Sequence, residues 1–214
     1  MNDRYSRQIA TGKITLSDQK ILIKKRVAIV GAGAIGSNMA VFLLRAGILN
    51  LTIIDRDFVE VSNLHRQYYT KKDVGKTKTD ALKTHLKEID GSSKITAYAK
   101  DMDVDTIELL ENHDLVIDAT DNMETRFLLN DFCMKNKIPW IYLAAIGTTA
   151  TAMNILPEKT ACFECVFGKE TPAGALDTCE TAGILNSTIL QITAHASVET
   201  IKMFMGKTPA LGIY

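Results

Sequence analysis

Residues 26–40, RVAIVGAGAIGSNMA, constrain the fold of this chain more than any other stretch. The short apolar run at 27–30 predicts a buried strand, and a helix-like stretch follows it. Between them stand Gly31, Gly33 and Gly36. Glycines after a strand let the backbone approach phosphate groups, and the next helix directs its N-terminal dipole and free N–H groups at them. The stretch therefore predicts a phosphate-binding loop of the dinucleotide type, without indicating which nucleotide binds.

Strand-like and helix-like segments alternate through most of the chain. Apolar runs predict strands at 27–30, 51–54, 95–99, 115–119 and 139–143. Amphipathic or capped stretches predict helices at 33–46, 77–89, 106–112 and 124–136. This βαβαβ order predicts an α/β fold, with a Rossmann-like, doubly wound and mostly parallel sheet that carries helices on both faces.

The pattern changes after Gly147. Residues 148–156 predict a C-terminal strand that leaves the parallel arrangement. Residues 157–182 are long and irregular and hold three of the four cysteines, which predicts an active-site loop. Residues 183–205 predict a closing helix. We expect one domain over residues 1–214.

The charge balance gives no signal for a strongly charged partner. Lys and Arg number 25 and so do Asp and Glu, so the formal net charge of zero indicates neither a nucleic-acid nor a membrane partner. The polar N-terminus lacks a secretory apolar region, and no run of about 18 apolar residues predicts a membrane span. Four cysteines are too few for a disulfide scaffold, which favours a cytoplasmic enzyme with a metal site or a reactive thiol.

Asp55 directly follows the second predicted strand, about 20 residues after the glycines. A carboxylate at that place suits hydrogen bonds to ribose hydroxyls. ATP and the adenosine half of NAD offer the same ribose, so Asp55 does not separate them. The alternative is that Asp55 is a surface turn residue.

The segment after Asp55 is rich in polar and charged side chains. Arg66 could clamp phosphate oxygens with its fork, and Lys78 could place a point charge on a departing phosphate. Asn63 could orient an oxygen. An NAD enzyme has no need of this set beyond the ribose carboxylate, whereas a reaction at a triphosphate does. The alternative is a solvated charged loop.

Carboxylates also follow the fourth predicted strand, in the stretch HDLVIDATDNMETR. Because ligands of open parallel sheets lie outside the carboxyl ends of the strands, Asp55 and Asp121 are expected to face one crevice. One carboxylate for ribose and one for Mg²⁺ suits ATP. The alternative is that Asp121 and Asn122 only cap the next helix. For Asp118, at the end of the strand, a purely structural role is one interpretation.

Six motifs in order resemble the ThiF/MoeB/HesA family, the bacterial relatives of ubiquitin-activating enzymes: RYSRQ at 4–8, GAGAIG at 31–36, DRDFVEVSNLHRQ at 55–67, GKTK at 75–78, DATDN at 118–122 and CFEC at 162–165. The resemblance implies an adenylyltransferase that uses ATP and Mg²⁺. Its substrate would be a ubiquitin-like sulfur carrier, ThiS- or MoaD-like, with a Gly-Gly C-terminus. The carboxylate attacks the α-phosphate, acyl-adenylate forms and pyrophosphate leaves, for thiamine or molybdopterin synthesis.

Roles for individual residues follow from the resemblance. The glycine loop would cradle ATP and Asp55 would hold its ribose. Asp121 would bind Mg²⁺, with Asn122 adjacent. Three side chains would act at the phosphates: Asn63, Arg66 and Lys78.

Two further residues take their predicted roles from the family. Arg7, in RYSRQ, would reach the ATP of the partner subunit, which makes the protein a homodimer. The alternative for Arg7 is a surface salt bridge in an N-terminal arm. Cys179 precedes the closing helix and would be a catalytic thiol; its alternative is a buried cysteine that anchors the loop. A thiol near a helix N-terminus has a lowered pKa and a higher reactivity.

The chain departs from the family at its cysteines. Cys162 and Cys165 have the spacing of half a tetrahedral zinc site. The family supplies a second CxxC after the closing helix, and this chain ends at Tyr214 without one. Neither Cys133 nor Cys179 has the right position. Three explanations stay open: a missing C-terminal tail, a natural absence of Zn²⁺, or ligands from another chain.

Other functions compete with this one. Within the family, the substrate could be another carboxylate, such as a peptide C-terminus or a modified tRNA nucleoside. A non-catalytic scaffold is a second alternative, against which the set of Arg66, Lys78 and Asp121 speaks. An NAD(P) oxidoreductase explains the glycine loop but leaves the later motifs without a purpose.

Overall fold

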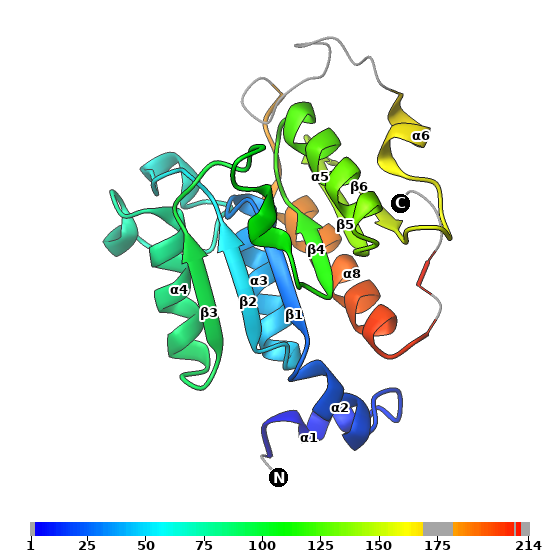
Figure 1. Ribbon diagram of the computed structural model, residues 1–214. Helices are drawn as coiled ribbons and strands as arrows, with labels where there is room; N and C mark the ends of the chain where they lie inside the picture. Colours follow the sequence, from blue (N-terminus) through cyan, green and yellow to red (C-terminus); the bar gives the residue numbers. More distant parts are fainter. Residues whose placement is uncertain (1–2, 169–181, 208, 211–214) are drawn as a thin grey trace.

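One six-stranded sheet runs through the middle of the protein (Figure 1). The computed structural model describes residues 3–168, 182–207 and 209–210. In spatial order the strands are β3 (Lys94–Tyr98), β2 (Asn50–Ile54), β1 (Arg26–Val30), β4 (Leu115–Asp118), β5 (Trp140–Ile146) and β6 (Thr149–Ile155). The first five are parallel, and β6 pairs antiparallel with β5. The predicted fold class is confirmed, including the strand that leaves the parallel arrangement.

Helices cover both faces of the sheet. The longer ones are α3 (Ala34–Ala46), α4 (Lys78–Ile89), α5 (Met123–Lys135) and α8 (Asn186–Phe204). The shorter ones are α1 (Ser6–Ile9), α2 (Leu16–Leu22), α6 (Phe163–Phe167) and the 3-10 turns η1 (Asp3–Tyr5), η2 (Val61–Asn63), η3 (Lys71–Asp73) and η4 (Ile107–Leu110). Among the described helices, none is long and apolar enough to cross a membrane.

The core consists of two apolar layers, one on each side of the sheet. Along β1, Val27 and Ile29 pack with the layer under α3, α4 and α8, whereas Ala28 and Val30 pack with the layer under α5 and α6. Side chains alternate between the faces of a strand, so a strand covered on both faces is apolar throughout. This is why a continuous apolar run, and not an alternating one, marked the central strands in the sequence.

Two expected elements differ from the structure. The helix predicted at 106–112 is only the 3-10 turn η4, and Asn112 has a left-handed φ of 61° that turns the chain toward β4. The irregular stretch predicted at 157–182 contains α6, while residues 169–181 lie outside the described part of the chain.

The N-terminal helices α1 and α2 lie below the amino ends of the strands (Figure 1). The side-chain amides of Gln8 and Gln19 donate to the carbonyl oxygen of Ala46, at 3.0 and 3.1 Å. Ala46 ends α3, and Gly47 caps that helix with a φ of 98°, as predicted. Because α3 runs back from the carboxyl edge of the sheet, its C-terminus and both short helices lie at the opposite edge.

Candidate nucleotide site at the carboxyl edge of the sheet

Three neighbouring strands end together at the predicted site. Val30 of β1 pairs with Ile54 of β2 on one side and with Asp118 of β4 on the other. The glycine loop, Asp55 and the turn after Asp118 therefore leave the sheet at one edge, as the expected parallel order requires.

The three loop glycines have different reasons to be glycine. Gly31 has a φ of +92°, and a Cβ there would lie 2.6 Å from the carbonyl oxygen of Ala119. A Cβ at Gly36 would lie 1.8 Å from the carbonyl oxygen of Gly31. At Gly33 the nearest atom is the Nε2 of Gln67, at 4.0 Å. Two glycines thus allow close backbone packing, and only Gly33 borders open space.

Helix α3 begins at this open space. Its N-cap is Gly33, no side chain caps it, and its first turn holds no acidic residue. The first N–H groups of a helix have no partner within the helix, and its dipole is positive at that end. The start of α3 is therefore suited to an anion such as a nucleotide phosphate.

The backbone of Ala32 is held at both its N–H and its carbonyl oxygen. Its N–H donates to the Oδ2 of Asp55 at 2.6 Å, and its carbonyl oxygen accepts from the buried Tyr69 hydroxyl at 2.7 Å. The Oδ1 of Asp55 accepts from the N–H of Asp57 at 2.7 Å. Each carboxylate oxygen has two lone pairs, so Asp55 keeps acceptor capacity for a ribose. Nothing in the local sequence distinguishes Tyr69, and our sequence analysis missed it.

Burial raises the pKa of Asp55, and the positive charge of Lys78 and the two amide hydrogen bonds oppose that rise. Lys78 is the first residue of α4, where the helix dipole disfavours a cation. Its largely buried Nζ donates to the Oδ2 of Asp57 at 2.7 Å. Lys78 therefore places a positive charge at the site although the dipole of α4 disfavours a cation there. The ion pair with Asp57 offsets this unfavourable interaction.

Asn63 and Arg66 lie on the segment between β2 and α4. The Oδ1 of buried Asn63 accepts from the N–H of Glu60 at 3.0 Å. The Nη1 of half-buried Arg66 donates to the carbonyl oxygen of Ser62 at 2.8 Å. Both side chains thus have partners within their own segment, and their action at phosphates stays a prediction.

Asp121 and Asn122 behave differently in the structure. The Oδ1 of Asn122 accepts from the N–H of Thr125 at 2.8 Å and caps α5. The capping alternative thus describes Asn122. Asp121 is exposed, and within the described residues its carboxylate has no hydrogen-bond or ion-pair partner. Asp118 is fully buried and accepts hydrogen bonds from Thr120, which agrees with a structural role.

Arg7 is far from this edge. It is exposed on α1, which packs against the C-terminal end of α3 below the amino ends of the strands (Figure 1). The structure therefore does not bring Arg7 to the site of its own chain.

The cysteine pair lies at α6. The Sγ atoms of Cys162 and Cys165 are 3.2 Å apart, and hydrogen bonds from Cys162 lower the pKa of the Cys165 thiol. Among the described residues, no third Cys, His, Asp or Glu joins them in a group that could hold a metal ion. A tetrahedral zinc site needs four ligands, so Zn²⁺ at this pair stays a prediction. Cys179 lies outside the described residues, and buried Cys133 packs in the core.

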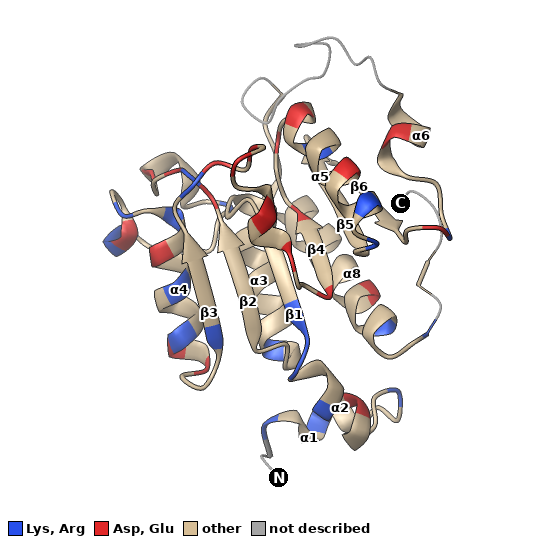
Figure 2. Cartoon of the chain, in the orientation of Figure 1, with Lys and Arg blue, Asp and Glu red and all other residues tan. Residues whose placement is uncertain are grey.

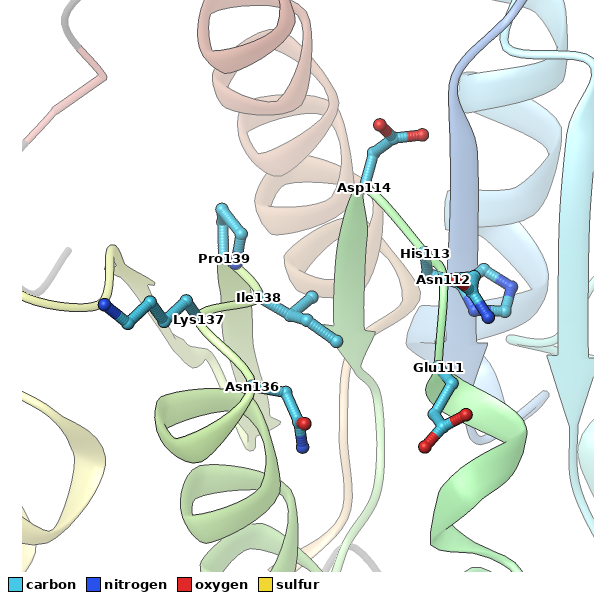
Figure 3. Close-up of a pocket in the computed structure, with 8 residues that line it drawn as sticks. All are labelled: Glu111, Asn112, His113, Asp114, Asn136, Lys137, Ile138 and Pro139. Atoms are coloured by element: carbon cyan, nitrogen blue, oxygen red, sulfur yellow. The ribbon is translucent and has the colours of Figure 1, made fainter.

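A hollow lies at the opposite edge of the sheet from the glycine loop. It has a volume of about 460 Å³ and lies between residues 111–114 and 136–139, which lead into β4 and β5 (Figure 3). Asp114, at its rim, is used by the fold: its carboxylate accepts from Lys25 Nζ at 2.9 Å and from the N–H of Arg26 at 2.8 Å. No residue predicted for the nucleotide site lines it.

The segment that carries Asn63, Arg66 and Lys78 is anchored by Asp73. Burial alone would raise the pKa of the Asp73 carboxyl, but hydrogen bonds from Thr70, His85 and Lys76 lower it well below its usual value. The folded state therefore gains stability from ionised Asp73 above the unfolded pKa of about 4 and loses it as pH falls.

We expect Asp73→Asn to lower the free energy of unfolding at pH 7 by about 1–3 kcal/mol, because it removes charged hydrogen bonds. The difference from the wild type should shrink as pH falls below about 4. Urea unfolding at pH 7 and pH 3 measures both values. A difference that stays equal at the two pH values would contradict this role.

The fold defines a class, the Rossmann-like α/β domains. The chain belongs to the ThiF family, whose family model matches residues 5–212. It is 37% identical over 211 residues to the sulfur carrier protein ThiS adenylyltransferase of Bacillus subtilis (strain 168), covering 97% of this chain and 62% of the relative. It is 34% identical over 210 residues to the adenylyltransferase and sulfurtransferase MOCS3 of Culex quinquefasciatus, covering 97% and 48%.

A solved structure shares the fold. The crystal structure of E. coli MccB with ATP superposes with a TM-score of 0.86 at 23% sequence identity, covering 100% of this chain and 71% of that chain. The chain spans 62% of the length of the ThiS adenylyltransferase and 48% of that of MOCS3.

Proposed function

We propose that this chain is an ATP- and Mg²⁺-dependent adenylyltransferase that activates the C-terminal glycine carboxylate of a ubiquitin-like sulfur carrier protein. Acyl-adenylate forms and pyrophosphate leaves. One observation carries the proposal: the carboxylate of Asp121, which has no partner among the described residues, shares a sheet edge with the open space beside Gly33 and with Asp55. The printed names of the relatives, ThiS adenylyltransferase and MOCS3, support the same reaction and carrier class.

The residues of this chain suit the binding of a nucleotide. Phosphates over the start of α3 meet free N–H groups and the positive end of the helix dipole. Asp55 binds the ribose with the lone pairs that Ala32 and Asp57 do not use. E. coli MccB was crystallised with ATP, and its shared fold is consistent with a nucleotide-binding role for this chain.

A carboxylate is a poor nucleophile toward a polyanion, so the site must position it and reduce the charge of the triphosphate. Lys78 gives up its ion pair with Asp57 and binds the departing phosphates instead. The guanidinium of Arg66 donates two parallel hydrogen bonds to phosphate oxygens. Asn63 orients one oxygen. Mg²⁺, held by Asp121 and phosphate oxygens, would neutralise further charge.

Arg7 is the basis for proposing a homodimer. We infer that Arg7 acts at the nucleotide of the partner subunit, because α1 lies at the edge of the sheet opposite to its own site. Charges of both signs are interspersed over the helices (Figure 2), which supports a small protein carrier over a nucleic acid as substrate. A cytoplasmic location stays a prediction.

Pyrophosphate–ATP exchange tests the proposed function. The assay contains Mg²⁺, labelled pyrophosphate and a panel of purified ThiS-like and MoaD-like carriers that end in Gly-Gly. We expect exchange with one carrier and none with the same carrier after removal of its last glycine. The carrier that supports exchange separates thiamine from molybdopterin synthesis. Tight ATP binding without exchange for any carrier would contradict the proposal and indicate another carboxylate, such as a peptide C-terminus.

A further inference from the structure

A buried ion pair lies directly behind the turn that carries Asp121. Asp118 ends β4 and is fully buried, and Arg126 on α5 is 7% exposed. The Nε of Arg126 and the Oδ2 of Asp118 are 3.7 Å apart, and neither atom has a hydrogen-bond partner among residues 3–168, 182–207 and 209–210. The two charges attract each other without sharing a hydrogen bond at these atoms.

The shorter hydrogen bonds of the pair go to Thr120, and the Nη1 of Arg126 also donates to the Sδ of Met123 at 3.6 Å. The Oδ1 of Asp118 accepts from the N–H of Thr120 at 2.9 Å and from its Oγ1 at 2.6 Å. The Nη2 of Arg126 donates to the carbonyl oxygen of Thr120 at 2.8 Å. Every polar group of Thr120 is therefore held by the ion pair.

The residues on both sides of Asp121 are held by hydrogen bonds, whereas its own carboxylate has no partner in the part of the chain that the structure describes. Thr120 is held by the ion pair, and Asn122 is held by its cap of α5. The backbone of Ala119, which precedes this turn, also packs closely against Gly31 of the glycine loop. Asp121 thus has a defined backbone position next to the glycine loop.

Stability alone does not explain this pair. Removal of two charges from water costs several kcal/mol per ion, and apolar residues of similar size are often as stable. The guanidinium of Arg126 also lies over the ring of Tyr142, with 5.1 Å from its central carbon to the ring centroid. That contact limits how the guanidinium can turn and keeps its Nη2 directed at Thr120.

We propose that Asp118 and Arg126 are positioning residues that set the place of the Asp121 carboxylate for the metal of the bound nucleotide. The proposal rests on the proposed function only in assigning that metal to Asp121. It adds two residues that do not touch the nucleotide themselves. Side chains behind metal ligands commonly change metal affinity by about 10- to 100-fold.

The test measures binding of Mn²⁺ by electron paramagnetic resonance in the presence of a non-hydrolysable ATP analogue, so it needs no carrier. Arg126→Lys keeps the charge but loses the fork that reaches Thr120. We expect it to weaken Mn²⁺ binding about tenfold. Thr120→Val, which loses the hydroxyl bond to Asp118, should also weaken it, and Thr120→Ser should restore it. AMP binding without metal should stay unchanged in all three variants.

Asn130→Ala is the matched control on the same helix. The Oδ1 of Asn130 accepts from the N–H of Phe163 at 2.9 Å, so this variant loses a buried hydrogen bond away from the turn. We expect it to lower the melting temperature without changing Mn²⁺ affinity. The proposal is overturned if Arg126→Lys lowers only the melting temperature, or if Asp121→Ala leaves Mn²⁺ affinity unchanged. Normal Mn²⁺ binding without carrier-dependent exchange would instead contradict the proposed function.

Discussion

Asp121→Ala is expected to reduce Mg²⁺-dependent pyrophosphate–ATP exchange by about 10²- to 10³-fold while the melting temperature stays that of the wild type. The Asp121 carboxylate is exposed and has no hydrogen-bond or ion-pair partner within the described residues, so its removal costs the fold little. Its loss at the nucleotide is large, because it would remove the protein ligand of the metal. Exchange rates and thermal unfolding of the same samples measure the two effects.

Asn122→Ala is the control for this variant. It removes the cap of α5 and should cost about 1 kcal/mol of stability, with a much smaller loss of exchange than Asp121→Ala. A fall of melting temperature in Asp121→Ala as large as in Asn122→Ala would show that Asp121 supports the fold and would contradict the prediction.

Asp121→Ala also serves to test whether Arg7 acts in the partner subunit. Arg7→Ala alone should lose exchange. When Arg7→Ala and Asp121→Ala chains form mixed dimers, one site of each mixed dimer has both residues intact, so about a quarter of the wild-type sites return at random pairing. Mixed dimers without activity would exclude action in trans.

Gly36→Ala is expected to lose stability, whereas Gly33→Ala is expected to stay folded and lose ATP affinity. A Cβ at Gly36 would lie 1.8 Å from the carbonyl oxygen of Gly31, so Gly36→Ala should cost about 3 kcal/mol or more of stability. A Cβ at Gly33 has no atom nearer than 4.0 Å, so Gly33→Ala should stay folded. Its methyl group would keep the phosphates from the α3 amides. ATP affinity should fall about 10- to 100-fold, as expected for one or two charged hydrogen bonds.

Urea unfolding gives the stability of both variants, and calorimetric titration of the folded Gly33→Ala protein gives its ATP affinity. The prediction fails if Gly33→Ala is destabilised as much as Gly36→Ala, or if it binds ATP as tightly as the wild type.

The sequence by itself determined the layers of this protein and the edge that holds the site. Apolar runs marked the parallel strands, because strands covered on both faces are apolar throughout. Parallel strands put their carboxyl ends at one edge, so Asp55 and the turn at Asp121 were expected together before any contact was known. Family motifs supplied the expected roles of Arg66, Lys78 and Asp121, which local periodicity does not encode.

Only the tertiary structure decided which residue of each motif is open to a ligand. The contact of Tyr69 with Ala32 spans 37 residues, and that of Asp55 with Ala32 spans 23. Such contacts depend on how separate strands and loops meet in space, and no local pattern of residues predicts them. For the same reason the sequence showed three equivalent glycines, whereas the packing of Gly31 and Gly36 against neighbouring backbone leaves only Gly33 beside open space.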